Sequence, residues 1–434
     1  MKTDTDIELT IDALGTRGDG VASFEGERVI VPLGVPGDRV KARLARDKEG
    51  RLVGRIRAII APGAARATPP CPHFGDHPAG GCGGCALQHL DAEAYRAWKL
   101  GQLVAALERQ GVPTGTIEPI AVSPPGSRRR ADLTVSRKKE AVILGFNARG
   151  SHRVVDLAAC TVLRPSLVAL FAPLRALLAP LTKPGDSAEV RLTATDSGAD
   201  VLLVTAIEVG AGARERVADF AARHDVARVA RAHPKRPGAE TLIERRTVRM
   251  DMGGVPVPLP PGAFLQATAE GEAALSSFVR EAAAGAAARG PTRIADLYAG
   301  IGTFTLPLAK AGAKVHAVDA GKAEIAAIEA AARAAVLAGV SAEVRDLEKR
   351  PLDAGAFAAF DLVIFDPPRA GAAAQAERIA ASKVPRVIAV SCNPGTFARD
   401  AKLLLDAGYR LARVKPVDQF LWSTHLELAA FFLR

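Results

Sequence analysis

The sequence predicts a three-part α/β protein whose last part, residues 255–434, is a doubly wound parallel sheet. From about residue 255 onward, short apolar runs alternate with helical segments, which is typical of a parallel sheet covered by helices. Before residue 62 the apolar runs are short and closely spaced between turn residues, which predicts a small β-barrel. The segment between them, residues 63–254, is expected to form a mixed α+β part that carries four cysteines.

Composition and charge narrow the class of function. The chain has 434 residues, of which 48% are hydrophobic, so it can bury the cores of two or three domains. Its net charge of +10 predicts a polyanionic partner. The apolar stretch at residues 167–181 is interrupted by two prolines and an arginine, so no membrane span is expected. The polar start, Met1 to Asp6, has no apolar signal region, and we expect a cytoplasmic monomer.

Residues 1–62 combine the barrel pattern with a basic strip. Residues 7–11 alternate apolar and polar side chains, Arg17 to Gly20 is a turn sequence, and further apolar runs follow. Between Arg39 and Arg57, eight Lys or Arg residues stand against two acidic ones. This strip can follow a phosphate backbone or form an ordinary solvated surface, and the sequence leaves both alternatives open.

The cysteines form a second signal. Five cysteines in a chain of this class are expected to be ligands or catalysts rather than disulfides. Cys82 and Cys85 have the spacing of a metal clip, and the glycines between them let both thiolates reach one ion or cluster. Four thiolates admit zinc or a 4Fe–4S cluster, and His73 and His77 keep zinc open. The expected ligand set is Cys71, Cys82, Cys85 and Cys160.

Basic residues also flank a strand in the middle part. An amphipathic helix is expected at residues 90–112, able to pack on the last part of the chain. After it, Arg128 to Arg130 and Arg137 to Lys139 flank an alternating strand at residues 131–135. Two triplets beside one strand are a candidate contact with an RNA backbone, although each alone is commonly just surface. Residues 141–250 carry strands and helices without a chemical signature.

The last part contains a candidate nucleoside site. A strand, a glycine turn and a helix start follow one another at residues 294–304, and the next strand ends in Asp319, where a carboxylate can accept a ribose diol. Thr305 stands where a dinucleotide motif has its third glycine, which disfavours NAD. Asp296, inside the motif, suits a cationic sulfonium better than a pyrophosphate. S-adenosylmethionine is therefore the better candidate cofactor.

Nucleophile and base chemistry is expected at the same edge of the sheet. Asp366 begins an Asp-Pro-Pro element that continues with Arg369 instead of an aromatic residue, so methylation of an exocyclic amine fits poorly. Cys392 follows a buried apolar run and is presented where a parallel sheet opens, although a buried structural cysteine is the simpler alternative. His425 and Glu427 share one face of an alternating segment, as a base and its partner would.

Five motifs in this order resemble those of the RNA uracil-C5 methyltransferase family. They are Phe264-Leu265-Gln266, Asp296-Leu297-Tyr298-Ala299-Gly300-Ile301-Gly302, Asp366-Pro367-Pro368-Arg369, Ser391-Cys392-Asn393-Pro394 and His425-Leu426-Glu427. The resemblance implies a Rossmann-like methyltransferase domain at the carboxyl end and an OB-like TRAM barrel at the amino end. It also implies a pocket for S-adenosylmethionine and substrate formed by Gln266, Tyr298, Gly300, Thr303, Asp319, Asp346 and Asp366. The family often has Asn at Thr303 and Glu at Asp319, and Asp319 keeps the carboxylate that a diol needs.

The resemblance also favours one metal group. Family members that modify ribosomal RNA carry a 4Fe–4S cluster on four cysteines, and Cys71, Cys82, Cys85 and Cys160 match those positions. The first spacing, ten residues, is longer than usual. A cluster is therefore expected, with zinc as the alternative, and its role is expected to be structural or RNA-positioning because methyl transfer has no redox step.

The implied mechanism follows from the weakness of uracil C5 as a nucleophile. The Cys392 thiolate adds to C6, C5 then takes the methyl group, and Glu427, oriented by His425, removes the C5 proton. The base must leave any helix to meet the thiol. We expect a uridine in 23S ribosomal RNA as the target. The alternatives are a T-loop uridine in transfer RNA, and an RNA-binding or chaperone-like protein with incidental methylation.

Overall fold

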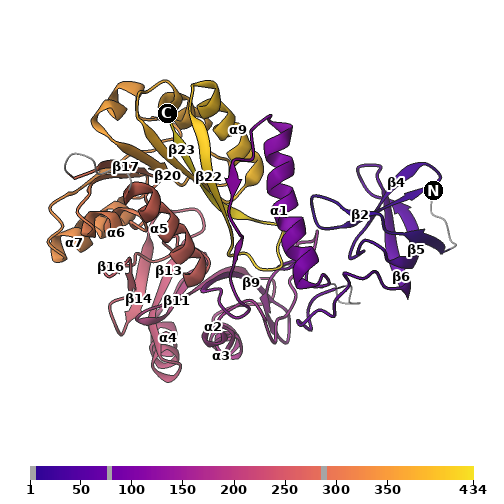
Figure 1. Cartoon of the computed structure of the whole chain (residues 1–434). Helices are drawn as coiled ribbons and strands as arrows, with labels where there is room; N and C mark the ends of the chain where they lie inside the picture. Colours follow the sequence, from indigo (N-terminus) through magenta and orange to yellow (C-terminus); the bar gives the residue numbers. More distant parts are fainter. Residues whose placement is uncertain (1–5, 76–80, 285–290) are drawn as a thin grey trace.

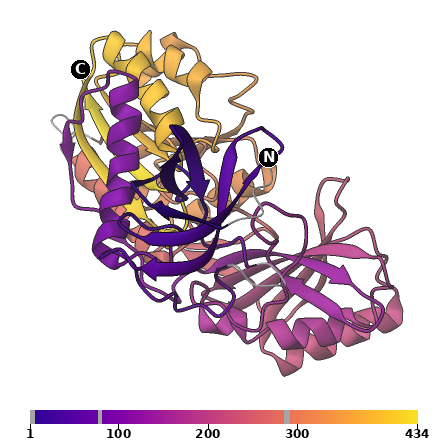
Figure 2. The same ribbon diagram turned by 90° about the vertical axis from the view of Figure 1, so that its right-hand side faces the viewer.

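The computed structural model describes residues 6–75, 81–284 and 291–434 (Figure 1, Figure 2). These residues form two six-stranded sheets, a two-stranded sheet and a nine-stranded sheet. The first sheet lies at one side of the molecule, and helix α1 (Ala92–Arg109) runs beside the last sheet. The described part of the chain contains no helix with the length and apolar character that crossing a membrane requires.

The small barrel expected at residues 1–62 corresponds to the first six-stranded sheet. Its order is β1-β5-β6-β4-β3-β2, and its pairs are antiparallel except β4 with β6, which is parallel. Alternating side chains such as Leu9, Val29 and Val40 point into its own apolar core. The strands are β1 (Ile7–Thr10), β2 (Ala13–Leu14), β3 (Gly20–Phe24), β4 (Glu27–Val31), β5 (Arg39–Arg46) and β6 (Leu52–Ala61).

Several arginines of the basic strip are paired with carboxylates on the same sheet. These exposed pairs are Arg43 with Asp6, Arg46 with Glu27 and Arg51 with Asp47. Surface ion pairs contribute little to stability, but they neutralise part of the positive potential of the strip. The solvated-surface alternative therefore accounts for a part of the strip.

The second sheet belongs to the middle of the chain. Its order is β10-β9-β11-β12-β13-β14, and the apolar faces of α2, α3 and α4 share one core with it. The strand expected at residues 131–135 lies within β9, which confirms it. The elements are β9 (Arg130–Arg137), β10 (Val142–Gly145), α2 (Pro165–Val168), α3 (Phe171–Leu178), β11 (Ser187–Thr195), β12 (Gly198–Val204), α4 (Ala211–Arg223), β13 (Val226–Ala232) and β14 (Ala239–Glu244).

The last sheet has the doubly wound order that the β/α alternation predicts. Its order is β19-β18-β17-β20-β21-β23-β22-β7, with β8 also paired to β22. Strands β17 to β21 are parallel, and β23 is inserted antiparallel to β21. The chain order reverses between β17 and β20, which is where ligands bind in such sheets. The strands are β17 (Arg293–Leu297), β18 (Lys314–Asp319), β19 (Val340–Val344), β20 (Leu362–Phe365), β21 (Arg386–Ser391), β22 (Arg410–Asp418) and β23 (Glu427–Leu433).

Helices cover both faces of this sheet. They are α5 (Ala269–Ala284), α6 (Thr305–Lys310), α7 (Lys322–Ala334), the 3-10 helix η1 (Ala354–Ala359), α8 (Ala373–Ala380) and α9 (Pro394–Asp406), and the hairpin of β15 (Arg249–Asp251) and β16 (Pro256–Pro258) precedes them. Glycine turns and apolar helical faces produce these short connections. The result places the ends of β17, β18, β20 and β21 at one edge.

A segment from the middle of the chain also joins this sheet. Helix α1 packs on α9, and Leu103 and Leu107 lie in the same apolar core as the sheet. After the helix, β7 (Thr116–Ile117) and β8 (Ala121–Val122) pair in parallel with β22. Residues 92–122 thus lie with the last sheet. The sequence expectation counted them in residues 63–254, but it also expected that the helix at 90–112 can pack on the last part of the chain.

A small apolar cluster connects the first sheet to the rest. Val35 from the first part packs with Tyr95 and Trp98 of α1 and with Leu421. Leu421 belongs to the segment between β22 and β23, which also carries the expected His425. This segment therefore contacts all three parts of the fold.

Candidate active site

Backbone geometry shapes the loop after β17. Gly300 and Gly302 have φ angles of 55° and 91°, which glycine adopts without strain, and Tyr298 has φ 60°. A Cβ added at Gly300 would meet nothing within 4 Å, so this loop is open toward the edge of the sheet. An added Cβ at Gly302 would lie 3.1 Å from the Leu306 side chain, so the loop is tightly packed beneath. The loop presents backbone to an incoming ligand.

The carboxylate of Asp319 is held by the same loop. The amide of Gly300 donates to Asp319 Oδ2 at 2.9 Å, and the amide of Gly321 donates to Oδ1 at 2.7 Å. Each oxygen keeps a further acceptor position. The side chain expected at the ribose diol is therefore oriented before any ligand binds.

Asp296 lies below this surface. Its side chain is fully buried, and burial raises its pKa to about 7. Thr305 Oγ1 donates to Asp296 Oδ2 at 2.5 Å, while Oδ1 has no hydrogen-bond partner among the described residues. Thr305 stands where a dinucleotide motif has its third glycine. Its hydroxyl instead forms a hydrogen bond with the buried carboxyl of Asp296.

The half-buried carboxyl of Asp366, the buried carboxyl of Glu427 and two buried amides form a connected chain. Gln266 Nε2 donates to Asp366 Oδ2 at 3.1 Å, and Gln419 Nε2 donates to Gln266 Oε1 at 2.6 Å and to Glu427 Oε2 at 3.0 Å. Burial, followed by the charge of Asp296, raises the pKa of Asp366 to about 7. Burial, followed by the charge of Asp366, raises the pKa of Glu427 to about 8. Carboxyls with pKa values this close to neutrality suit proton transfer.

Cys392 lies directly after β21. The side chain of Asn393 caps the following helix α9 by accepting from the Gly395 amide at 3.0 Å. The thiol is half-buried, and burial together with the charges of Glu427 and Asp366 raises its pKa to about 11. The structure therefore brings Cys392 and the two carboxyls together at one edge of the sheet, with the thiol in its protonated form.

His425 has different neighbours from those expected. Its Nε2 lies 3.3 Å from Arg369 Nη1, and the hydrogen-bond partner of Glu427 is Gln419. Burial, with the charges of Arg369 and Lys99 adding to it, lowers the pKa of His425 to about 4. The imidazole is therefore neutral at physiological pH.

The remaining residues of the expected cofactor pocket are Tyr298, Thr303 and Asp346, and fewer contacts hold their side chains. Tyr298 is half-buried, and burial raises the pKa of its hydroxyl to about 12. Thr303 is half-buried at the start of the turn into α6. Asp346 follows β19 and forms an ion pair with Lys349 at 3.0 Å. None of these three side chains joins the carboxyl chain among the described hydrogen bonds.

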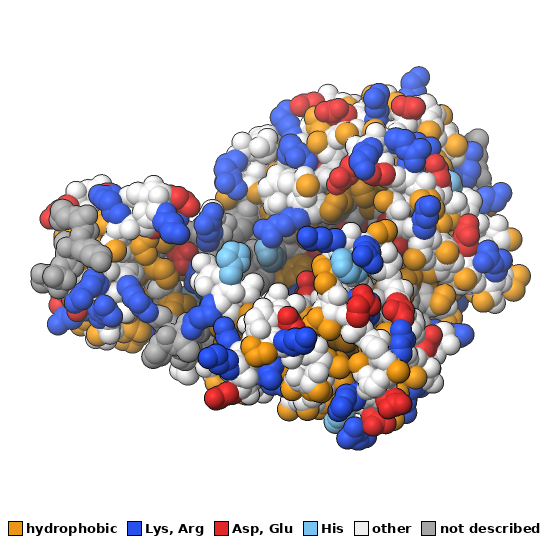
Figure 3. Space-filling model, turned by 180° about the vertical axis from the view of Figure 1, so that it is seen from behind, with side chains coloured by type: hydrophobic (Ala, Val, Ile, Leu, Met, Phe, Trp, Pro, Cys, Tyr) orange, Lys and Arg blue, Asp and Glu red, His pale blue; other side chains and the backbone are white. Residues whose placement is uncertain are grey.

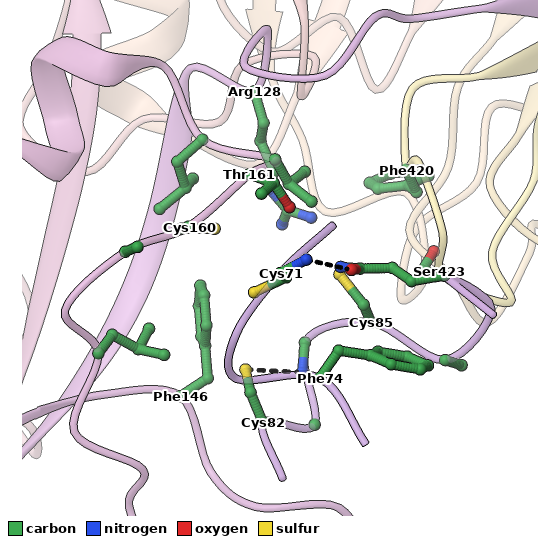
Figure 4. A pocket seen from close by; sticks show the side chains of 18 of the residues that line it. Cys71, Phe74, Cys82, Cys85, Arg128, Phe146, Cys160, Thr161, Phe420 and Ser423 are labelled. Carbon is green, nitrogen blue, oxygen red and sulfur yellow. Dashed lines mark hydrogen bonds between the residues drawn. The ribbon is translucent and has the colours of Figure 1, made fainter. Parts of the chain in front are cut away.

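The four other cysteines line one cavity of about 340 Å³ (Figure 4). Its walls also include Phe74, Arg128 and Phe146, and its far side includes Phe420 and His425. Burial raises the pKa of three of the ligand candidates: that of Cys82 to about 11, that of Cys85 to about 12, and that of Cys160 as well. The ligand candidates are Cys71, Cys82, Cys85 and Cys160.

The described side chains of this cavity do not form a compact metal site. Among the described residues, no group of three or more His, Cys, Asp or Glu side chains is placed to hold a metal ion. His73 Nε2 accepts from the Ala158 amide at 3.1 Å. His77, the other histidine that kept zinc open, lies outside the described residues.

Seen from behind the view of Figure 1, the molecule is hollowed near its centre (Figure 3). Lys and Arg side chains gather around this hollow, and histidines lie beside it. A basic rim around a depression is the electrostatic pattern that a polyanion requires.

Sequence reasoning missed the residues that hold the site in place. Gln419 joins the two carboxyls, and Asp418 beside it is bound by Tyr95 and Lys99 of α1. The available signal was the polar pair Asp418-Gln419 at the end of a mixed strand, at the same edge as Asp366 and Cys392. The partner helix could not be identified from that signal, because more than 300 positions of chain separate it from the strand.

Comparison with known proteins defines the class. The chain superposes on the Pyrococcus abyssi tRNA (uracil-54, C5)-methyltransferase solved with S-adenosyl-L-homocysteine, with a TM-score of 0.74 and 23% identity over 98% of this chain and 100% of that chain. The chain therefore has the fold of that methyltransferase.

Sequence relatives give the family. Residues 260–434 match the tRNA (Uracil-5-)-methyltransferase family model. The chain is 42% identical to an uncharacterized RNA methyltransferase of Caulobacter vibrioides, over 98% of this chain and 100% of the relative. It is 38% identical to the 23S rRNA (uracil(1939)-C(5))-methyltransferase RlmD of Chromohalobacter salexigens, over 96% of this chain and 87% of the relative. The chain belongs to the RNA uracil-C5 methyltransferase family and is an S-adenosylmethionine-dependent enzyme of that class.

Proposed function

We propose that this enzyme methylates C5 of a specific uridine in 23S ribosomal RNA through a covalent bond between Cys392 and C6. The observation that carries the proposal is the meeting of Cys392, Asp366 and Glu427 at the edge of the sheet, beside the open glycine loop. Ribosomal RNA is favoured because one relative is a 23S enzyme and because the four-cysteine cavity accompanies the catalytic sheet. Such a target is consistent with action in the cytoplasm and by a monomer, both of which stay predictions.

The cofactor is proposed to lie along the ends of β17 and β18. Asp319, held by two backbone amides, would accept hydrogen bonds from the two hydroxyls of the ribose. The backbone at Gly300 leaves room for the nucleoside. The same pocket would include Gln266, Tyr298, Thr303, Asp346 and Asp366. Asp366 and Gln266 are the two that also touch the carboxyl chain, so they would hold the uracil edge next to the methyl group.

The first step needs a thiolate at Cys392. Because its pKa is raised to about 11, the proton must be taken by a neighbour. Asp366, with a pKa raised to about 7, is the neighbour proposed to take it, so that Glu427 stays ionised for the later step. Sulfur then adds to C6, C5 gains carbanion character, and the methyl group passes from sulfonium to C5. Glu427 takes the C5 proton, the C5–C6 double bond returns, and the C6–S bond breaks.

The four cysteines are proposed to hold a 4Fe–4S cluster. The support is the donor set: four thiols, the ligands such clusters use, line one cavity of about 340 Å³. A bound cluster would supply a rigid, charged wall beside the segment between β22 and β23. Zinc remains the alternative that the donor types allow.

The first sheet is proposed to be a TRAM barrel that binds the RNA backbone. Its partly neutralised strip keeps unpaired basic positions such as Lys41 and Lys48, for which the structure records no ion pair among the described residues. Binding through phosphates predicts that affinity falls steeply as salt rises.

The test is transfer of labelled methyl from S-adenosylmethionine to unmodified 23S ribosomal RNA and, in parallel, to unmodified transfer RNA, followed by nucleoside analysis. The proposal expects 5-methyluridine in the ribosomal RNA alone. 5-Methyluridine in transfer RNA alone would overturn the substrate, and no 5-methyluridine in either RNA would overturn the proposal.

Transfer RNA is the second candidate, because the solved structure with this fold is a transfer RNA enzyme and the matching family model carries that name. The substitution Cys392→Ala distinguishes an enzyme from the RNA-binding or chaperone-like alternative. A binding activity survives this change, whereas methyl transfer does not.

A further inference from the structure

Gln419 occupies the centre of the carboxyl chain. Its Nε2 donates both to Gln266 Oε1 and to Glu427 Oε2, and its Oε1 accepts from the Ala267 amide at 2.7 Å. The side chain is buried, with 1% of its surface exposed. A Cβ added at Gly271 would lie 2.7 Å from Gln419 Cβ, so the helix α5 packs directly on this residue. No rotation of the amide is available without losing packing or hydrogen bonds.

These contacts fix the direction of every hydrogen bond in the chain. Because a backbone amide can only donate, Gln419 Oε1 must face Ala267 and Nε2 must face Gln266 and Glu427. Gln266 then accepts through Oε1, so its Nε2 must face Asp366. The Gln419 amide therefore directs an N–H donor toward the buried carboxyl of Glu427 and, through Gln266, toward the half-buried carboxyl of Asp366.

The neighbouring residue is clamped by α1. Lys99, fully buried, lies 2.9 Å from Asp418 Oδ1, and Tyr95 donates to Asp418 Oδ2. Lys99 also donates to the carbonyl of His425, and the Trp422 amide donates to the Tyr95 hydroxyl at 2.8 Å. Both ends of the segment that carries Gln419 are thus tied to one helix.

We propose that Gln419 is a positioning residue that holds Glu427 where it can remove the C5 proton, and that aligns Asp366 through Gln266. This inference rests on the proposed function, in which Cys392 is the nucleophile and Glu427 the base. In the step concerned, the C5–H electron pair forms the C5–C6 double bond, the proton passes to Glu427, and the C6–S pair returns to Cys392. Gln419 touches none of the reacting atoms and acts through Glu427.

A positioning role predicts a specific kinetic signature. Gln419→Met keeps the length of the side chain and removes its donors, so the methylated adduct still forms but breaks down slowly. Single-turnover reactions would use 23S ribosomal RNA that carries [5-³H]uridine. Two quantities would be measured: the SDS-resistant protein–RNA adduct and the tritium released to water. We expect tritium release to slow by about tenfold, the effect of one lost hydrogen bond to a charged group, while the adduct accumulates.

Gln375→Met is the matched control. Gln375 is also buried and also bonds to backbone, through the Leu352 amide at 2.9 Å, but it touches no carboxyl of the site. Gln419→Glu is the second variant, since it keeps an acceptor for Ala267 and places a competing carboxyl beside Glu427. It should accumulate adduct as well, whereas Gln375→Met should not.

The outcomes are distinguishable. Accumulation of adduct in both Gln419 variants supports the inference. Equal slowing of adduct formation and tritium release, or no change in either, overturns it. If Cys392→Ala forms adduct or releases tritium in the same assay, the proposed function fails instead.

Discussion

The four cysteines that line the cavity and Cys392 have the same type of side chain but different neighbours. Burial raises the pKa of Cys82, Cys85 and Cys392 alike, to about 11 or 12. A raised pKa therefore does not distinguish a ligand from a nucleophile. The neighbours do: each cavity thiol has other thiols near it, whereas Cys392 has two carboxyls that can exchange protons near neutral pH.

The two regions are also joined. The segment between β22 and β23 supplies Phe420 and His425 to the cavity wall, and Gln419 to the carboxyl chain. Its Trp422 carbonyl accepts from the amides of Ala86 and Leu87, directly after Cys85. Changes at one site therefore have a short structural route to the other, and the predictions below separate the two roles.

The largest effect is expected from Cys392→Ala. Removing the nucleophile should lower methyl transfer by roughly a thousandfold or more, because C5 cannot be activated without the C6 adduct. The measurement is single-turnover methylation together with iron content, and iron should be unchanged. Substantial residual methylation would mean that Cys392 is a buried structural cysteine and not the nucleophile.

Glu427→Gln should be the next largest. Loss of a general base typically lowers a rate by roughly 10²–10⁴-fold, so turnover falls while the methylated adduct builds up. Electrophoresis under denaturing conditions measures the adduct. A fall in turnover without adduct would contradict this prediction, since Glu427 would then act before methyl transfer.

The pH dependence should follow the base. Glu427 acts only when ionised, and its pKa is raised to about 8, so the ionised fraction and the rate of tritium release rise between pH 7 and pH 9 by about tenfold. The rate falls as pH drops below 8 because the carboxyl is then protonated. Glu427→Gln is the control and should be flat over this range; a wild-type rate that falls with rising pH contradicts the assignment.

Cys85→Ser should have the smallest effect on chemistry and a large one on the cavity. Anaerobically purified wild-type protein is expected to contain about four irons per chain, and the variant far fewer. Methyl transfer should fall only several-fold, through loosening of the segment that carries Gln419. Stoichiometric zinc in the wild type, or iron retained in the variant, would refute the cluster.

Much of the fold follows from local pattern. The strand, glycine turn and Asp319 are close in sequence, and each depends on backbone geometry that glycine and alternating residues specify. Cys392 was predictable because an apolar run that ends in Ser-Cys-Asn-Pro specifies both a strand end and a helix cap. Such features need no knowledge of distant contacts.

The rest depended on contacts between distant segments. Gln419 gains its role from Gln266 and Glu427, and Lys99 from a strand more than 300 residues away. The partner proposed for Glu427 was His425 because alternation places both on one face, but the strand begins only at Glu427, so His425 turns toward Arg369 instead. Period-two patterns hold only inside a strand.

The most direct test of the central claim uses RNA in which the target uridine is replaced by 5-fluorouridine. Fluorine cannot leave C5 as a proton does, so the adduct should be trapped after methyl transfer. Digestion and mass spectrometry would locate the bond. The account predicts a methylated fluorouridine attached to the peptide that contains Cys392; a bond to any cavity cysteine, or no bond with active cofactor binding, would contradict it.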